Sequence, residues 1–325
     1  MKTFASMRFA AALALALFSP SLLAQSYPAK PVRMVIGLPP GGGSDPMARV
    51  LAQRLTVMWG QPVVVENRPG ANTIIATEIV AKAPGDGLTL LFAFDHSFTL
   101  NPHMYAKLPY DPIKDFAPIT QLLTFAVPLV AHPSLRANSV QELVALAKAE
   151  PGKLSYGSIG IGSHMHIVSE LLNAKAGINI AHVPYKGIPQ MTAALLGGEI
   201  QLTWFGIFTT RPLVAQKRVN ALAYSGTKRS PFMPEVPTFA ELGFPGVDIA
   251  VWYGIAAPSG TARPIVDKIH ADISKILSDP EFRDKEILSR AYDPSGLGPD
   301  EFSALIRREL AVRAEVVRIS GAKVE

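Results

Sequence analysis

Two glycine-rich stretches hold the residues whose types and spacing are best suited to chemistry. The first, in "IGLPPGGGSDPMARVLAQRL", contains Gly41 and Gly43, then Ser44 and Asp45 ahead of a helical pattern. Glycines permit positive φ and leave the backbone bare to a ligand. Serine is a favourable N-cap, and a helix N-terminus binds anions through its N–H groups. The stretch therefore predicts an anion site, with a plain strand-to-helix turn as the alternative.

The second stretch, "LSYGSIGIGSHMHIVSELL", repeats this chemistry. Its candidate ligand residues are Ser158, Gly160, Gly162 and Ser163. If the two stretches face each other, two helix N-termini form a two-sided clamp for a small carboxylate. Neither stretch has the G-x-G-x-x-G spacing or a following Gly-Lys-Ser/Thr, so nucleotide phosphate is disfavoured.

Other chemistries have less support from the residues. A serine-hydrolase elbow requires glycine where Tyr156 stands. His164 and His166 are two apart, so on a helix they point to different faces, and no His-Glu-x-x-His set follows. The sequence has no cysteine, which excludes thiolate nucleophiles, disulfides and Cys-ligated metals. We expect no catalytic residue, no metal and no cofactor, and one histidine, His166, near the ligand.

Several further side chains have two interpretations each. Asp45 is either a favourable acid in the first turn of a helix or the partner of a cation on the ligand. Tyr185, in "HVPYKG" at a strand end, lines a cleft or belongs to a plain turn. We assign Trp204 to the core and Phe205 to the cleft, and Trp252 fits either place.

Short β-rich runs alternate with helical patterns along the chain, which is typical of α/β folds. Helices are expected over residues 45–59, 73–83, 163–176, 189–196, 210–216, 262–278 and 299–320. A long extended segment at residues 115–134 indicates a crossing between two lobes. We predict a two-lobe architecture of mostly parallel sheets with flanking helices, hinged at crossing strands. Residues 27–125 and 235–325 form one lobe, and residues 126–234 form the other.

The first 24 residues have the layout of a secretory signal, with an ordinary N-terminal helix as the alternative. Lys2 and Arg8 precede an apolar run, and Pro20 and small residues follow it. We therefore expect cleavage after Ala24 and export to the periplasm. Removing this segment lowers the formal net charge from +5 to +3. Such a weakly basic chain lacks the charge of a nucleic-acid binder, and we expect a monomer without a nucleic-acid partner.

Strings through nearly the whole chain resemble the Bug family, the periplasmic solute receptors of tripartite tricarboxylate transporters. They include "VRMVIGLPPGGGSDPMARVLAQRL", "NPHMYAKLPYDPIKDFAPIT", "SYGSIGIGSHMH" and "WYGIAAPSGTARP". The resemblance implies two α/β lobes with a carboxylated ligand between them, and delivery to integral-membrane permease subunits. Carried onto matching positions, it singles out as ligand-binding residues Gly41, Gly43, Ser44, Asp45, Ser158, Gly160, Gly162, Ser163 and His166.

The chain departs from the family pattern at three places. It reads "NTIIATE" after Ala71, where a Gly-Gly-Asn-rich loop is usual, and it has Gly206 where an acid is common. Asp95 and His96 stand where the family more often has small residues. We hypothesise that Asp95 and His96 contact the distal part of the ligand, an amine, a ring nitrogen or a second polar group. The alternative is that they pair with each other at the rim.

The leading functional hypothesis is a non-enzymatic receptor that closes around a carboxylated metabolite and presents it to a permease. Two alternatives stay open from the sequence. The liganded protein is the input of a signalling partner, or the chain is an exported hydrolase or lyase.

Overall fold

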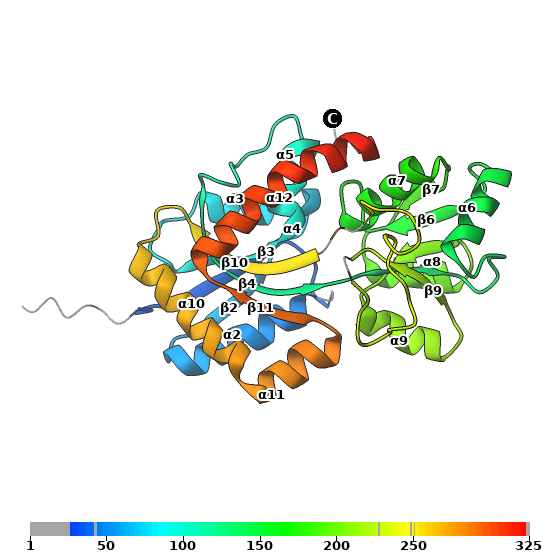
Figure 1. Ribbon diagram of the computed structural model, residues 1–325. Helices are drawn as coiled ribbons and strands as arrows, with labels where there is room; N and C mark the ends of the chain where they lie inside the picture. Colours follow the sequence, from blue (N-terminus) through cyan, green and yellow to red (C-terminus); the bar gives the residue numbers. More distant parts are fainter. Residues whose placement is uncertain (1–26, 42–43, 227, 248, 250, 323–325) are drawn as a thin grey trace, which may run out of the picture.

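The two lobes of the protein lie side by side in the computed structural model (Figure 1). The structure describes residues 27–41, 44–226, 228–247, 249 and 251–322. The expected signal segment and Gly43 lie outside these residues. Each lobe is built on one β-sheet covered by helices.

The sheet of the first lobe has the strand order β11-β4-β10-β3-β1-β2. Its central strand β3 is buried on both faces, as expected for a strand covered by helices on either side. β1 pairs in parallel with β2 and β3, whereas β10 runs antiparallel to both β3 and β4. The strands are β1 (Val32–Ile36), β2 (Val63–Asn67), β3 (Thr89–Phe94), β4 (Phe116–Phe125), β10 (Val251–Pro258) and β11 (Asp293–Leu297).

The sheet of the second lobe has the order β7-β6-β8-β5-β9. β6 runs parallel to β7 and β8, and β5 runs antiparallel to β8 and β9. The two-lobe α/β architecture is thus confirmed, but both sheets are mixed, because the strands at the crossings run against their neighbours. The strands are β5 (Pro128–Ala131), β6 (Ser155–Ser158), β7 (Ala181–Pro184), β8 (Leu202–Trp204) and β9 (Asn220–Tyr224).

The helices agree closely with the apolar periodicity of the sequence. The short helices α4 and α5 and the longer helix α6 lie outside the helical ranges expected from the sequence. The helices are α2 (Asp45–Trp59), α3 (Ile74–Ala81), α4 (Asp95–Thr99), α5 (Asn101–Met104), α6 (Val140–Ala149), α7 (His164–Ala176), α8 (Ile188–Leu196), α9 (Ile207–Ala215), α10 (Arg263–Ser278), α11 (Pro280–Phe282) and α12 (Pro299–Ser320).

Two large aromatic side chains anchor the cores of the lobes. Trp204 is fully buried and donates from Nε1 to Ser169 Oγ (2.8 Å), which confirms its assignment to the core. Trp252 is also buried, packs against Phe98 and Phe302, and donates to Glu309 Oε2 (2.8 Å). Each indole N–H therefore has an acceptor, as a buried tryptophan requires.

The chain crosses between the sheets from β4 to β5 and returns at β10. Thr238 bridges to Tyr224 and Phe239 packs against Trp204, so contacts with the second sheet continue past residue 234. The last helix, α12, lies on the first lobe and reaches across to pack against α7 of the second (Figure 1). Within the described ranges, no helix has the length and apolar character needed to cross a membrane.

Candidate ligand site between the lobes

The first glycine-rich loop joins β1 to α2 at the carboxyl edge of the sheet. Gly41 has φ +79°, and nothing lies within 4 Å of a Cβ placed on it. Gly37 is required for a different reason, because a Cβ there would come within 2.6 Å of Thr73 Cβ. The loop thus combines a left-handed position with a close approach to residues 71–73.

Asp45 organises this loop from inside. Its Oδ2 accepts from Gly41 N–H (3.1 Å) and Arg49 Nε (3.0 Å), and its Oδ1 accepts from Asn67 Nδ2 (2.9 Å). Burial raises the pKa of Asp45, but the hydrogen bonds from Arg49, Asn67 and Gly41 outweigh it and hold the pKa below its usual value. Both carboxylate oxygens therefore accept hydrogen bonds from the protein itself. This arrangement favours a structural role of Asp45 at the start of α2 over a role as partner of a ligand cation.

Ser44 occupies the N-cap position of α2, but its hydroxyl makes no capping hydrogen bond. The N-cap position agrees with the expectation from the sequence, but the helical backbone angles (φ −88°, ψ −27°) differ from the extended conformation in which a serine hydroxyl caps. The hydroxyl is 1 % exposed and has no hydrogen-bond partner among the described residues. It is a buried donor and acceptor at the start of α2.

The second glycine-rich loop joins β6 to α7. Gly160 has φ +120° and Gly162 has φ +80°, conformations that L side chains rarely adopt. Ser163 caps α7 by accepting from His166 N–H (3.4 Å), as the sequence predicted, and donates to Gly160 O (2.7 Å). The loop is thus fixed by its own serine and glycines.

Two histidine rings lie beside the second loop, and one of them accepts a hydrogen bond from it. Gly162 N–H donates to His166 Nδ1 (3.2 Å), so Nδ1 is the acceptor and this imidazole is neutral. The His166 ring packs on His182, with ring centres 4.4 Å apart, and burial lowers the pKa of both rings to about 4. His166 therefore holds the loop through its Nδ1.

Ser158 lies within hydrogen-bond distance of a histidine, with its Oγ 2.6 Å from His182 Nε2. The same Oγ accepts from Gly160 N–H (3.0 Å) and lies 3.1 Å from Gly160 O. Ser158 is fully buried. Its hydroxyl therefore closes the loop, with one of its two lone pairs taken by the Gly160 amide.

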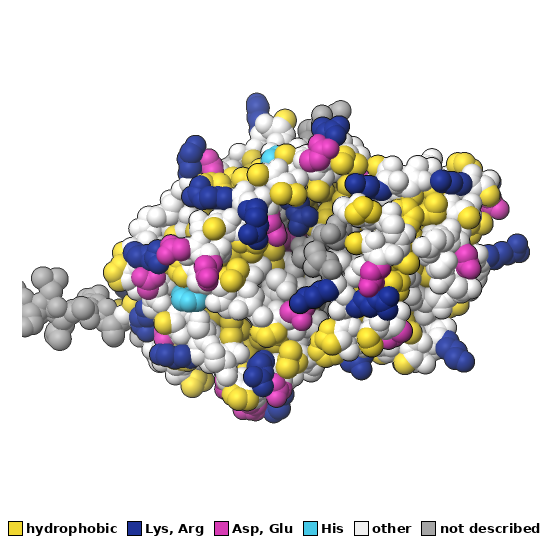
Figure 2. Space-filling view, in the orientation of Figure 1, with side chains coloured by type: hydrophobic (Ala, Val, Ile, Leu, Met, Phe, Trp, Pro, Cys, Tyr) yellow, Lys and Arg dark blue, Asp and Glu magenta, His cyan; other side chains and the backbone are white. Residues whose placement is uncertain are grey.

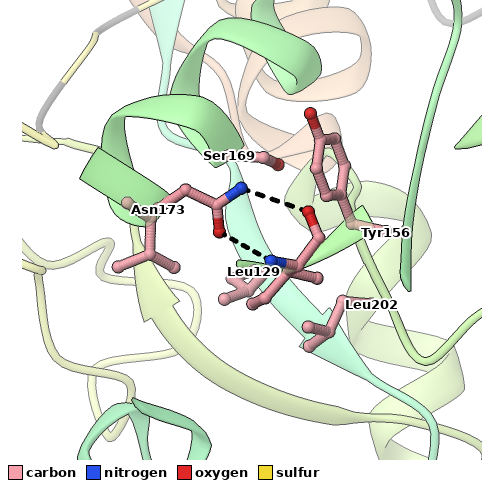
Figure 3. A pocket seen from close by; sticks show the side chains of 7 residues that line it. Leu129, Tyr156, Ser169, Asn173 and Leu202 are labelled. Atoms are coloured by element: carbon pink, nitrogen blue, oxygen red, sulfur yellow. Dashed lines mark hydrogen bonds between the residues drawn. The ribbon is translucent and has the colours of Figure 1, made fainter. Parts of the chain in front are cut away.

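Side chains behind the loop fix α7 against β6. Tyr156 Oη donates to Glu170 Oε1 (2.6 Å), and Asn173 bonds both backbone groups of Ile180 (3.1 Å each). Figure 3 shows these Asn173 bonds beside a small pocket of the second lobe. These contacts hold the middle and the last turn of α7 (Glu170 and Asn173) against the neighbouring strand segments. The pocket is lined by Leu129, Tyr156, Ser169, Leu172, Asn173, Ile180 and Leu202.

The lobes touch at the second loop through residues that the sequence analysis did not assign. Asn72 Nδ2 donates to Gly162 O (3.1 Å) and to Asn101 Oδ1 (2.6 Å). A Cβ on Gly162 would come within 2.3 Å of Met104 Cε. Asn72 and Met104 belong to the first lobe and Gly162 to the second, so the contacts of Asn72 and Met104 with Gly162 exist only while the lobes are together.

The Asn72 loop is strained. Ala71, Asn72 and Thr73 have φ of 44°, 50° and 71°. Such conformations cost on the order of 1–3 kcal/mol each for non-glycine residues and concentrate at functional sites. This is the segment "NTIIATE" that departs from a glycine-rich pattern, and that departure is the sequence signal that pointed to it.

Asp95 and His96 follow β3 at the same sheet edge as the first loop. Asp95 is fully buried and His96 is 8 % exposed. His96 Nδ1 lies 3.6 Å from Asp95 Oδ1, beyond hydrogen-bond range. Burial raises the pKa of Asp95, but the interactions with His96, His164 and Arg313 hold it below its usual value. The structure thus adds His164 and Arg313 to the residues near Asp95.

Tyr185 and Phe205 lie together on the second lobe. Phe205 is 1 % exposed and belongs to a hydrophobic cluster with Val130 and Met191. Tyr185 is half-buried against the same cluster, and its N–H donates to Ser158 O (2.8 Å). Their packing is that of core residues behind the second loop, and contact with a ligand stays a prediction for both.

The charged groups of the described residues do not form a metal site. Across the described residues, no group of three or more His, Asp or Glu is arranged to hold a metal ion. On the face shown in Figure 2, Lys and Arg side chains are interspersed with Asp and Glu. What the site offers is a pair of helix N-termini, buried hydroxyls and one buried carboxylate without hydrogen bonds, which suits a small polar ligand.

Comparison with known proteins identifies relatives along the whole chain. The family described as "Tripartite tricarboxylate transporter family receptor" matches residues 47–318. The protein BugT of Bordetella pertussis is 33 % identical over 303 residues, which cover 93 % of either chain.

Two solved structures of Rhodopseudomonas palustris proteins share the fold. One, solved with adipate, is 31 % identical, with a TM-score of 0.85 over 92 % of this chain and 100 % of that one. The other, MatC with bound malate, is 28 % identical, with a TM-score of 0.82 over 90 % of this chain and 100 % of that one.

Proposed function

The chain belongs to the tripartite tricarboxylate transporter receptor family, and we propose that it captures a small carboxylated metabolite between its lobes and delivers it to the permease of such a transporter. The family is one of solute receptors. The observation that carries the proposal is the pairing of two glycine-rich loops, one per lobe, each opening a helix of at least 13 residues.

The ligand carboxylate is held mainly by backbone N–H groups and hydroxyls of these loops. Each helix N-terminus contributes up to about 1–2 kcal/mol toward a bound anion. Charge-assisted hydrogen bonds add about 1.5–3 kcal/mol each, so a few of them reach the 8 kcal/mol or so of micromolar binding without an Arg or Lys. The unpartnered hydroxyl of Ser44 is a direct donor in this proposal.

The other residues proposed for the site have three roles, which are to shape the loops, to admit the ligand to the backbone, and to line its far end and one wall. Asp45, Ser158, Ser163 and His166 shape the loops through the hydrogen bonds described above. Gly41, Gly43 and Gly160 let the ligand approach the backbone, whereas Gly162 makes room for Met104 of the first lobe. Asp95 and His96 face the far part of the ligand, and Tyr185 and Phe205 support the wall of the second lobe.

Binding drives closure because the ligand touches both loops only when the lobes are together. The bonds of Asn72 to Gly162 O and the packing of Met104 on Gly162 form in the same state. We place the hinge at the two crossings, between β4 and β5 and just before β10.

Delivery requires export, which we assign to residues 1–24 as a cleaved signal. The mature receptor then works as a periplasmic monomer that docks on integral-membrane permease subunits. Adipate and malate are ligands of relatives, and for this chain we propose only the carboxylate class.

Isothermal titration calorimetry of unfolded and refolded protein, free of retained ligand, tests this function. The panel comprises mono-, di- and tricarboxylates, aromatic acids and amino acids, with the neutral amides of the same acids as matched controls. We expect one-to-one binding by at least one acid and none by its amide. Equal binding of acid and amide, or no binding by a protein with native circular dichroism, contradicts the proposal.

A further inference from the structure

Asp95 is a buried carboxylate with no hydrogen-bond donor in the described chain. It is 0 % exposed, and neither Oδ1 nor Oδ2 has a hydrogen-bond partner. His96 Nδ1 lies 3.6 Å from Asp95 Oδ1, beyond hydrogen-bond range. Buried polar groups are almost always satisfied, and an exception indicates a missing partner such as a ligand or water. A charge without donors is the most costly case.

Arg313 is the cationic side chain near Asp95, but its ion pair is with Glu309. Arg313 Nη2 lies 3.9 Å from Glu309 Oε2, and Glu309 also accepts from Trp252 Nε1. Burial lowers the pKa of His164 to about 4, so this imidazole is neutral near pH 7. Arg313 therefore makes no hydrogen bond to Asp95, and its Nε is itself buried without a partner among the described residues.

Asp95 lies where the ligand is proposed to bind. β1 and β3 are parallel neighbours, with Ile36 opposite Phe92, so the first glycine-rich loop and Asp95 leave the same edge of the sheet. On the other lobe, His164 opens α7 directly after the second loop. Ser44 Oγ and His164 Nδ1 are also buried without hydrogen-bond partners in the part of the chain described. The helices α2, α4 and α7 thus each begin at or beside a buried group without a hydrogen-bond partner among the described residues.

We propose, building on the receptor function above, that Asp95 binds a cationic amine at the end of the ligand opposite the clamped carboxylate. The ligand class is then an amino carboxylate with separated charges. A dicarboxylate would place its second negative charge against Asp95, which is unfavourable at a buried site. The preference should therefore differ from that of the relative solved with adipate.

Calorimetry with matched ligand triples tests this assignment. Each triple attaches three distal ends, an amine, a hydrogen or a carboxylate, to the same alkyl carboxylate, for example 5-aminopentanoate, pentanoate and adipate. The amino acids of the series have from three to six carbons. We expect the amine member of one triple to bind at least about tenfold more tightly than the other two. In Asp95→Asn the advantage of the amine member disappears, and the plain monocarboxylate keeps its wild-type affinity within about threefold.

The control variant is Asp272→Asn. Asp272 is a buried acid on α10 that accepts from Trp59 Nε1 (2.8 Å) and Lys268 Nζ (2.7 Å), so it has donors of its own. This variant also removes one negative charge, but at a position outside the proposed site. The order of affinities within each triple should therefore stay the same.

Three outcomes separate the ideas. A dicarboxylate or plain acid that binds as tightly as its amine counterpart overturns the role of Asp95 while leaving the receptor function intact. An amine preference that survives in Asp95→Asn also overturns it, and assigns Asp95 to an internal pair with His96. If no member of any triple and no acid of the wider panel binds, the receptor function itself fails. The wild-type ranking needs no variant, so it decides the proposal even if Asp95→Asn does not fold.

Discussion

Replacing Gly162 by alanine should weaken ligand binding through a clash that exists only when the lobes are together. The added Cβ would lie 2.3 Å from Met104 Cε, 3.1 Å from Met104 Sδ and 3.2 Å from Asn72 Nδ2. The thioether can rotate away at a cost of about 1 kcal/mol. Disturbing the bond from Asn72 to Gly162 O costs about 1 kcal/mol more. A penalty of about 2 kcal/mol on the closed state corresponds to about 30-fold weaker affinity.

The same substitution also strains the backbone, and this second effect must be separated from the first. Gly162 has φ +80°, where a Cβ costs about 1–2 kcal/mol. That strain is present in the open and closed folded states alike, so it lowers the free energy of unfolding but not the affinity. Gly177, which ends α7 with φ +61° and nothing within 4 Å of a Cβ, offers a matched control.

Calorimetric Kd and urea denaturation together test this reasoning, using the acid that wild-type protein binds most tightly. Gly162→Ala and Gly177→Ala should each lose about 1–2 kcal/mol of unfolding free energy. Only Gly162→Ala should lose affinity, by about 30-fold, while Gly177→Ala stays within about threefold of wild type. Equal Kd values for the two variants would refute the closure contact.

Three further predictions concern stability. Because burial lowers the pKa of His166 from 6.5 to about 4, the unfolded chain binds a proton between these pH values that the folded chain does not. The free energy of unfolding therefore falls as pH drops through this window. The variant His166→Asn keeps an acceptor for Gly162 N–H but cannot take up this proton. Denaturation curves at pH 7 and 4.5 should show a drop in unfolding free energy that is smaller in the variant by up to about 3 kcal/mol. Asp45→Asn should cost about 1–3 kcal/mol in urea denaturation, since its oxygens accept three hydrogen bonds, and no change would contradict the structural role. Trp252→Phe should cost a similar amount by depriving Glu309 of a donor, and a melting temperature equal to that of wild type would count against this.

The sequence predicted best where periodicity and boundary residues agree. The helix expected over residues 299–320 is α12, which begins at Pro299 after Gly298 and ends before Gly321. The two glycine-rich loops were found because both the positive φ of glycine and the helix that follows have local signals. Ser163 caps its helix for the same reason.

The missed features depend on tertiary packing. Ser44 has the right residue type for a cap, but its backbone is helical at the N-cap position. Asn72 and Gly162 are 90 residues apart, and only the closed arrangement of the lobes brings them into contact. The positive φ of Thr73 has no local signal, since a β-branched residue disfavours this conformation.

The neighbourhood of Asp95 was predicted only in part. His96 is adjacent in sequence, so a pair was foreseeable, whereas His164 and Arg313 come from α7 and α12 and join Asp95 only in the folded chain. From the sequence, His166 is the histidine expected near the ligand. In the structure His166 braces the second loop, and His164 is the histidine that interacts with Asp95.

Native mass spectrometry of the protein before and after refolding tests the central claim most directly. A receptor of this kind should carry one small organic acid per chain when freshly purified, lose it on unfolding, and recover the same mass shift when that acid is returned. The bare mass of the chain in every sample, with no shift from any carboxylate of the panel, would contradict the proposed receptor function.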